Sequence, residues 1–346
     1  MSSTVSTPRI ATLQPAWAIP GGRVSIVGRG FSLGGPTLPG VRVGGTPARV
    51  VCASTDRIDI IVPRCEGGRQ PVRVDGTPGE TPYLEIGTRI ATGLHLVDSP
   101  AFAPDGTLYV TYSGSRDQRT PVSVYRIPPG GIAEPFSSVA NPTSLAVDGR
   151  SRVFVSSRFE GTVYRLEPDG TPVVVATDLG VPCGLAVDEL GTVFVGDRSG
   201  AVLRIRPGGE VHAVATLPAS VAAFHLALGP DGSLYVTGPT LSSHDNLYRI
   251  TEDGEISELA SGFGRPQGLA FDSRGTLFAI EALAGVSGMH RIAADGRREL
   301  VLAGANLIGV AFDPTGGLVV ATSDSVFRFD VGLRGVVPAP SDTEPA

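Results

Sequence analysis

The chain has 346 residues, of which 46 are Gly, 29 are Pro and 41% are hydrophobic, and its formal net charge is -6. Disordered chains combine much Gly and Pro with few apolar residues, so this composition argues against disorder and favours short strands joined by tight turns. All 28 basic residues are Arg and they form no basic cluster, which argues against a nucleic-acid partner.

The first residues contain no basic segment followed by an apolar stretch, so the sequence as given predicts no secretory signal. No apolar run is long enough to span a membrane. We therefore expect a cytoplasmic protein, or an extracytoplasmic one if the natural start lies further upstream. A monomer is expected, although the sequence does not determine the oligomeric state.

Residues 8–83 do not repeat and read as short alternating strands near 24–27, 40–43, 48–51, 58–62 and 71–74. Gly and Pro turns separate these strands, a pattern that predicts a small antiparallel β-sandwich of the immunoglobulin-like kind. The segment resembles the TIG/IPT family of immunoglobulin-like domains in Pro20-Gly-Gly, Ile26-Val-Gly-Arg-Gly-Phe and Val43-Gly-Gly-Thr-Pro-Ala. The resemblance implies a packing or interaction module without catalytic chemistry.

The three cysteines, Cys52, Cys65 and Cys183, are too few for a disulfide framework and match no zinc motif. We interpret them as small buried residues. Pairing of Cys52 with Cys65 across neighbouring strands stays open from the sequence.

Six segments in the rest of the chain share the pattern Gly-Leu-Ala-x-Asp-x-x-Gly-x-Leu-Phe-Val. Anchored on Phe102, Val147, Val187, Leu228, Phe271 and Phe312, they are spaced by 45, 40, 41, 43 and 41 residues. Each reads as four strands, and the third strand carries an Arg between apolar residues. Four strands in about 41 residues are one blade of a β-propeller. We call the segments repeats one to six.

The last repeat supplies three strands only, whereas a strand-like segment, 84–93, precedes the first repeat. We infer that this segment completes the sixth blade and closes the ring. The predicted fold is thus all-β: an immunoglobulin-like β-sandwich at 8–83, a six-bladed β-propeller at 84–333 and a Pro-rich disordered tail at 334–346.

The repeats resemble the NHL-repeat and the gluconolactonase/regucalcin-like six-bladed propellers of bacterial type. Membership in the lactonase group implies a divalent cation in the central channel, bound by a carboxylate and by Asn or Asp residues before the inner strands. The matching positions here are Asp98, Cys183, Phe224 and Gln267. Because three of these four depart from the family's ligands, we expect no cofactor, and a divalent cation is disfavoured.

Two layers of residues begin the inner strands and are expected to converge on the channel. The outer layer is Asp98, Thr143, Cys183, Phe224, Gln267 and Ile308, and the inner one is Ser99, Ser144, Gly184, His225, Gly268 and Gly309. Such a mixture of polar and apolar groups fits a ligand site, and equally fits a plugged channel. His225 is expected to reach across the axis toward Asp98 and Ser99, either as a general base or as a structural histidine.

The loops between second and third strands open on the same face and are longest at 112–121, 238–245 and 281–288. Their polar residues are Tyr112, Arg116, Asp117, Arg158, Asp197, Arg198, His244, Asp245 and Glu281. We expect ligand contacts from Asp98, Ser99, Thr143, Cys183, Phe224, His225, Gln267, Asp197 and Glu281. The opposite face, built from similar Asp-Gly turns, offers less variety for recognition.

Two functions remain. The first is a binding protein that takes a small molecule, glycan or peptide on the channel face, with the sandwich as an accessory domain. The second is a gluconolactonase-like hydrolase of lactones or esters with altered or absent metal ligation, in which His225 and Asp98 are the catalytic candidates.

Overall fold

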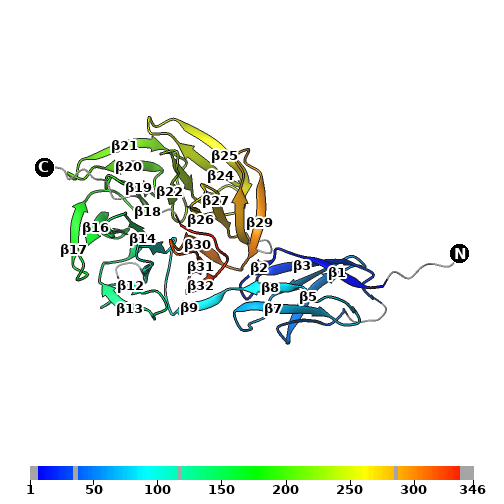
Figure 1. Cartoon of the computed structure of the whole chain (residues 1–346). Coiled ribbons are helices and arrows are strands. Elements are labelled where there is room, and N and C mark those ends of the chain that lie inside the picture. The colour runs from blue at the N-terminus through cyan, green and yellow to red at the C-terminus, as the bar shows by residue number, and fades with distance from the viewer. Residues whose placement is uncertain (1–6, 34–37, 116–117, 284–286, 336–346) are drawn as a thin grey trace.

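The computed structural model describes residues 7–33, 38–115, 118–283 and 287–335 (Figure 1). These residues form strands, turns and no helix, so the prediction of an all-β protein is confirmed. It follows that they include no helix able to cross a membrane.

Eight short strands at the N-terminal end lie to one side of the remaining sheets (Figure 1). They pair in the order β1-β3-β6-β5-β4-β7-β8-β2. Their bounds are β1 (Arg9–Gln14), β2 (Trp17–Ala18), β3 (Arg23–Arg29), β4 (Val41–Val43), β5 (Thr46–Ala53), β6 (Arg57–Ile61), β7 (Gly68–Val74) and β8 (Tyr83–Ile86).

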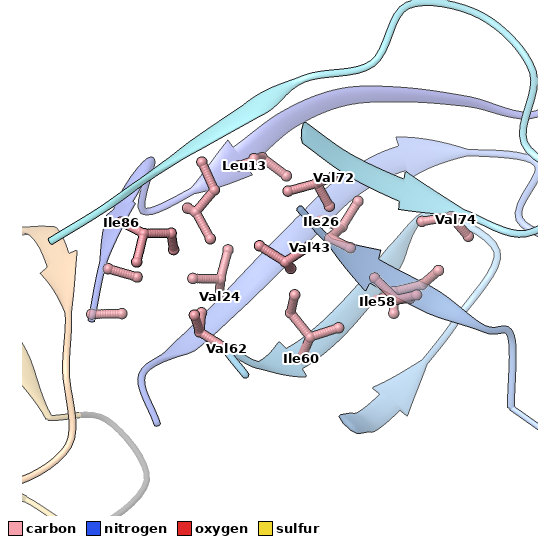
Figure 2. Packing of buried hydrophobic residues seen from close by; sticks show 14 of the residues in the cluster. Leu13, Val24, Ile26, Val43, Ile58, Ile60, Val62, Val72, Val74 and Ile86 are labelled. Carbon is pink, nitrogen blue, oxygen red and sulfur yellow. The ribbon is translucent and has the colours of Figure 1, made fainter. Parts of the chain in front are cut away.

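Alternating side chains of these strands form a hydrophobic core, which also includes Ala303 of repeat five (Figure 2). In β4, for example, Val41 and Val43 are buried and Arg42 between them is exposed. Figure 2 shows Val24 and Ile26 of β3 among residues of β6 and β7, such as Ile60 and Val72. The period of two residues therefore selects the buried face of each strand.

A buried carboxylate, Asp59, lies beside this core and receives several hydrogen bonds. Arg23 donates to Asp59 Oδ2 at 2.6 Å, Arg57 to Oδ1 at 2.8 Å and Ser25 to Oδ1 at 2.7 Å. Burial alone would raise the pKa of Asp59, but these hydrogen bonds outweigh it and hold the pKa well below its ordinary value. Asp59 therefore stays charged and joins β3 to β6.

The repeats form a β-propeller in which five four-stranded antiparallel sheets surround a centre (Figure 1). The first three are β10 (Ala101–Phe102), β11 (Leu108–Thr111), β12 (Val124–Ile127), β13 (Glu134–Ser137); β14 (Pro142–Val147), β15 (Val153–Ser157), β16 (Thr162–Leu166), β17 (Pro172–Ala176); and β18 (Pro182–Val187), β19 (Val193–Asp197), β20 (Ala201–Ile205), β21 (Val211–Thr216). The others are β22 (His225–Leu228), β23 (Leu234–Thr237), β24 (Asp245–Ile250), β25 (Ile256–Phe263); and β30 (Leu307–Phe312), β31 (Leu318–Thr322), β32 (Ser325–Phe329) with β9 (Thr88–Thr92).

Repeat five also forms four antiparallel strands, but they do not stand as a separate sheet. These strands are β26 (Pro266–Phe271), β27 (Leu277–Glu281), β28 (Gly288–Ile292) and β29 (Arg298–Ala303). Strand β2 pairs in parallel with β8 on one side and with β29 on the other, through Trp17 opposite Glu85 and Leu302. One twelve-stranded sheet thus runs from the N-terminal strands into repeat five.

The inner strands follow one another around the channel: β10, β14, β18, β22, β26 and β30 each contact the next, and β30 contacts β10. The last sheet takes its outer strand from the chain before repeat one, because β9 pairs antiparallel with β32. The expected closing strand is therefore present at Thr88–Thr92. The first part of that segment, Tyr83–Ile86, instead pairs with β7 and β2.

The Asp of the repeat pattern organises the turn between the first two strands. Asp188 Oδ1 accepts hydrogen bonds from the backbone N–H groups of Leu190 and Thr192, and Asp272 does the same for Arg274 and Thr276. A carboxylate that accepts from two backbone amides of the same turn favours a tight reversal. This is a physical reason for Asp at that point of the repeat.

The chain after β32 returns to the propeller: Ser273 N donates to Arg334 O and Gly335 N to Asp313 O. Of the disordered tail expected at 334–346, Arg334 and Gly335 are therefore bonded to the propeller, and 336–346 lie outside the described residues. Cys52, Cys65 and Cys183 are free thiols, so the pairing of Cys52 with Cys65 that the sequence left open does not occur.

Candidate functional site

A buried histidine and carboxylate meet inside the channel. Asp98 precedes β10 and His225 begins β22, and His225 Nδ1 lies 2.5 Å from Asp98 Oδ1. His225 is 1% exposed and Asp98 is 5% exposed. The same Asp98 oxygen accepts the N–H of Ser99 at 2.6 Å. The expected approach of His225 to Asp98 is confirmed.

The pair sets the tautomer of the ring. Because Asp98 is a hydrogen-bond acceptor, it holds the proton of neutral His225 on Nδ1 and leaves the lone pair on Nε2. His225 Nε2 is buried and makes no hydrogen bond within the described part of the chain. This is the arrangement of a general base, enclosed where solvent does not reach it.

The residues level with His225 close the channel. The Ser99 hydroxyl accepts the N–H of Val310 at 3.2 Å, and the Ser144 hydroxyl accepts the N–H of Leu185 at 3.0 Å. A Cβ on Gly309 would lie 2.6 Å from Ser99 Cα. We name these residues the channel layer: Ser99, Ser144, Gly184, His225, Gly268 and Gly309.

A cavity of about 350 Å³, here called the upper cavity, opens on the loop side of this layer. Thr143, Cys183 and Gln267, expected at the mouths of inner strands, line it together with Ile308. Arg158 and Arg198 enter from the loops that follow β15 and β19. Its other lining residues are His95, Leu96, Val97, Val181, Val221, Ala222, Ala223 and Ser323.

Among the described residues, two arginines and a histidine line the upper cavity and no carboxylate does, so the charged groups at its wall are basic. Arg198 is directed at the backbone carbonyls of Ser220 and Val221, at 3.4 and 3.5 Å. Arg158 is partly buried and, among the described residues, has neither a hydrogen bond nor an ion pair. The upper cavity is therefore suited to an anionic group.

Cys183 lies in the wall of this cavity as a neutral thiol. Burial raises its pKa to about 12, and the thiol donates to Val181 O at 3.2 Å. A thiol in this state is a poor nucleophile. Cys183 therefore shapes the cavity without supplying covalent chemistry.

Phe224 does not face the channel, so the sequence prediction for its side chain is wrong. It is 2% exposed and belongs to a core cluster with Leu226 and Val202. Gly196 and Gly238 make room for it, since a Cβ on either would lie 2.8 Å from a Phe224 atom. Ala222 and Ala223 line the upper cavity at this point instead.

Asp197 and Glu281, also expected to contact ligand, are engaged with their own loops. Asp197 Oδ1 accepts the N–H of Val181 at 2.6 Å. Glu281 Oε1 accepts the N–H of Gly264 at 2.6 Å, and Oε2 lies 3.0 Å from His290 Nε2. Burial would raise the pKa of Glu281, but these hydrogen bonds and the nearby Arg298 outweigh it and lower the pKa. Neither carboxylate lines the upper cavity.

Of the remaining loop residues, some contact neighbours in their own loop and others lie outside the described residues. Asp245 accepts from Thr240 N and Oγ1, and His244 contacts Ser243. Tyr112 lies against His95, their ring centroids 6.1 Å apart. Arg116 and Asp117 lie outside the described residues. His95 lines the upper cavity, although the sequence offered no signal beyond its place three residues before Asp98.

A larger cavity, of about 550 Å³, opens on the other side of the channel layer. We call it the lower cavity. It shares no lining residue with the upper cavity and continues along the same inner strands, as Leu145, Leu185, Leu226, Leu269 and Val310 show. Because the turns on this face are alike, the sequence predicted less variety for recognition there. Side chains of the inner strands line most of the cavity, and turn residues such as Asp188, Leu190 and Pro230 line its outer part.

The residues at the channel mouth do not fit a divalent cation. Within the described residues, no three His, Cys, Asp or Glu side chains gather in a way that could hold a metal ion. Asp98 is bonded to His225, Cys183 is a neutral thiol and Phe224 is turned away. We therefore derive no chemistry through a channel metal.

Solved structures show the same fold at low sequence identity. A gluconolactonase from Xanthomonas campestris matches with a TM-score of 0.57 and 20% identity, over 69% of this chain and 87% of that one. An auxiliary nutrient binding protein from Bacteroides thetaiotaomicron matches with a TM-score of 0.53 and 11% identity, over 94% and 98%. No protein-family model matches the chain.

The fold is therefore a β-propeller, the fold also found in that gluconolactonase and in a regucalcin from Agrobacterium tumefaciens. The sequence comparison is narrower. Virginiamycin B lyase of Nocardia farcinica is 32% identical over 230 residues, which are 61% of this chain and 77% of that protein. The chain belongs to the virginiamycin B lyase family.

Proposed function

We propose that the propeller has six blades, with β26–β29 as the fifth, and that residues 8–83 form an immunoglobulin-like sandwich similar to TIG/IPT domains. Strands β26 to β29 pair antiparallel in sequence, as the strands of a blade do, and the inner strands contact one another around a closed ring of six. Both observations support a total of six blades. The core around Val24 and Ile60, to which repeat five contributes only Ala303, supports the sandwich.

We further propose that the protein binds a small anionic molecule in the upper cavity. The observation that carries this proposal is Arg158, a partly buried guanidinium at the cavity with no ion pair among the described residues. A planar guanidinium binds carboxylate or phosphate in a bidentate manner, and Gln267 and Thr143 offer further polar contacts. The fold shared with an auxiliary nutrient binding protein supports a binding role.

Calorimetric titration with a panel of small carboxylates and phosphate esters, gluconate among them, tests this proposal. We expect at least one to bind saturably, and Arg158→Met to weaken that binding about tenfold or more, since a charge-assisted hydrogen bond is lost. Arg150→Met is a control on the opposite end of repeat two. A panel without any saturable binding, or binding that Arg158→Met leaves unchanged, contradicts the proposal.

A second candidate is an enzyme that opens a cyclic ester, either by hydrolysis or by elimination. In the elimination, the base removes a proton from carbon, a C=C bond forms, and the alkyl C–O bond breaks to release the carboxylate. Two observations favour it: the family relative is named a virginiamycin B lyase, and His225 with Asp98 has the form of a general-base pair. The burial of His225 Nε2 requires that the channel layer open before a substrate reaches it. Mass spectrometry of lactones and cyclic depsipeptides incubated with wild-type protein and His225→Gln would detect this activity.

A further inference from the structure

The third strand of every repeat carries an arginine, and five of the six are ion-paired. The partners lie on the neighbouring strand, in the next turn or in the turn before the second strand. The pairs are Arg126–Glu134 at 3.2 Å, Arg165–Glu167 at 2.5 Å, Arg249–Asp231 at 2.7 Å, Arg291–Glu299, and Arg328–Asp313 at 2.7 Å.

Arg204 of repeat three is the exception among the described residues. Its cross-strand neighbour on β21 is His212, where repeats one and five place Glu134 and Glu299. The nearby carboxylate, Glu210, is 3.1 Å from Arg206 and 3.0 Å from His212. Arg204 Nε is buried and makes no hydrogen bond within the described part of the chain. A buried guanidinium donor without an acceptor is costly, and an external acceptor would remove that cost.

Arg204 lies in the wall of a cavity of about 330 Å³ between the sheets β18–β21 and β22–β25, which we call the inter-blade cavity. Most of its wall is apolar: Phe194, Val214, Leu228, Leu234 and Ile250 line it. It also shares Asp188, Leu190, Leu228 and Gly232 with the lower cavity. The inter-blade cavity is therefore an apolar branch of the lower cavity that contains one unpaired guanidinium.

Two carboxylates line the same cavity, and neither pairs with Arg204. Asp188 Oδ1 accepts the backbone N–H groups of Leu190 and Thr192, which fixes its carboxylate in the turn. Glu252 is exposed at the edge. Asp313 occupies the position of Asp188 in repeat six, and Arg328 donates to it at 2.7 Å. Repeat three lacks the corresponding hydrogen bond between Arg204 and Asp188.

We propose that the inter-blade cavity binds a small amphiphilic carboxylate. Its carboxylate accepts hydrogen bonds from Arg204, and its alkyl or aryl body lies among Phe194, Leu228 and Ile250. An apolar wall with a few placed polar groups is the usual form of a small-molecule site. This site lies on the opposite side of the channel layer from the upper cavity, so it stands independently of the anion site at Arg158.

Calorimetry with sodium octanoate and with octanol tests the proposal on the full chain. Octanoate is expected to bind saturably, and Arg204→Met is expected to weaken it about tenfold or more, because a charge-assisted hydrogen bond disappears. Octanol is expected to bind Arg204→Met at least as well as wild type, since Met keeps the apolar wall. Arg206→Met is the matched control: Arg206 lines the same cavity but is paired with Glu210, and its loss is expected to change octanoate affinity by less than about twofold.

If Arg204→Met does not fold, the side-chain Nε–H resonance of Arg204 in wild-type protein provides the readout, and octanoate is expected to shift it. The proposal is overturned by the absence of saturable octanoate binding, by equal binding to wild type and Arg204→Met, or by an equal loss in Arg206→Met. The effect of Arg158→Met on anion binding in the upper cavity tests only the proposed function and does not bear on the inter-blade cavity.

Discussion

Gly268 fits against Ser99 so closely that a Cβ at position 268 would lie 2.3 Å from the Ser99 hydroxyl oxygen. These two residues, from repeats five and one, bring the channel layer together near the axis. We predict that Gly268→Ala lowers the free energy of unfolding by about 1–3 kcal/mol, because the added methyl group forces inner strands apart. Urea unfolding monitored by circular dichroism measures the change.

Gly208 is the matched control, because a Cβ there meets no atom within 4 Å and its φ is not positive. Gly208→Ala is expected to leave stability unchanged or to raise it by about 0.4–1 kcal/mol. Equal effects of the two substitutions would contradict the close fit.

The buried pair of His225 and Asp98 is expected to be energetically coupled. Asp98→Ala removes the acceptor from a buried imidazole and should cost about 1–3 kcal/mol of stability, as should His225→Ala. Because either change alone leaves an unsatisfied group, the double variant should cost less than the sum of the two. A double-mutant cycle from denaturant unfolding gives the coupling energy, and strict additivity would show that the pair contributes nothing.

Acid should destabilise the N-terminal strands through Asp59. The folded-state pKa of Asp59 lies below its ordinary value of 3.8, so its contribution to stability is complete above about pH 5 and is lost as the pH falls toward the folded-state pKa. Asp59→Ala should cost about 1.5–3 kcal/mol at pH 7 and remove much of this acid dependence, since hydrogen bonds to a charged group are lost. Unfolding curves from pH 3 to pH 7 for both proteins test the sign.

Thiol labelling should separate the three cysteines. Cys52 is exposed, whereas Cys183 is 2% exposed and burial raises its pKa to about 12. At pH 8 a disulfide reagent should label Cys52 readily and Cys183 only after unfolding. Mass spectrometry of the labelled peptides identifies the sites, and rapid labelling of native Cys183 would show that the wall of the upper cavity opens.

The closing strand can be tested by shortening the chain. Thr88–Thr92 pair with β32, and Ser325 Oγ lies 3.0 Å from Thr92 Oγ1. A chain that begins at Leu94 lacks this strand and should unfold at a lower temperature than one that begins at Thr81. Equal melting temperatures would show that β9 does not hold the last sheet together.

The sequence was sufficient for those parts of the structure that depend on a repeating local pattern. The regular spacing and the turn Asp predicted the propeller, and the missing fourth strand of the last repeat pointed to Thr88–Thr92. The same periodicity placed His225 on the axis, where it meets Asp98, 127 residues away.

Features that depend on contacts between repeats could not be predicted in this way. The ring of Phe224 turns into the core because Gly196 in β19 and Gly238 just after β23 leave space for it. Likewise, the arginine pattern is uniform along the sequence, and the exception at Arg204 appears only once the register with His212 is known. The carboxylates Asp197 and Glu281 looked free because their backbone donors, Val181 and Gly264, are distant in the chain.

The insertion of β2 between β8 and β29 has a mechanical consequence. Backbone hydrogen bonds connect the N-terminal strands directly to the outermost strand of repeat five, so a load on the N-terminal end reaches the propeller rim through a β-ladder as well as through the chain. The same insertion covers the edge of β29 at Leu302 and Ala303. Less of that edge is therefore free to pair with another molecule, which lowers the risk of edge-to-edge aggregation.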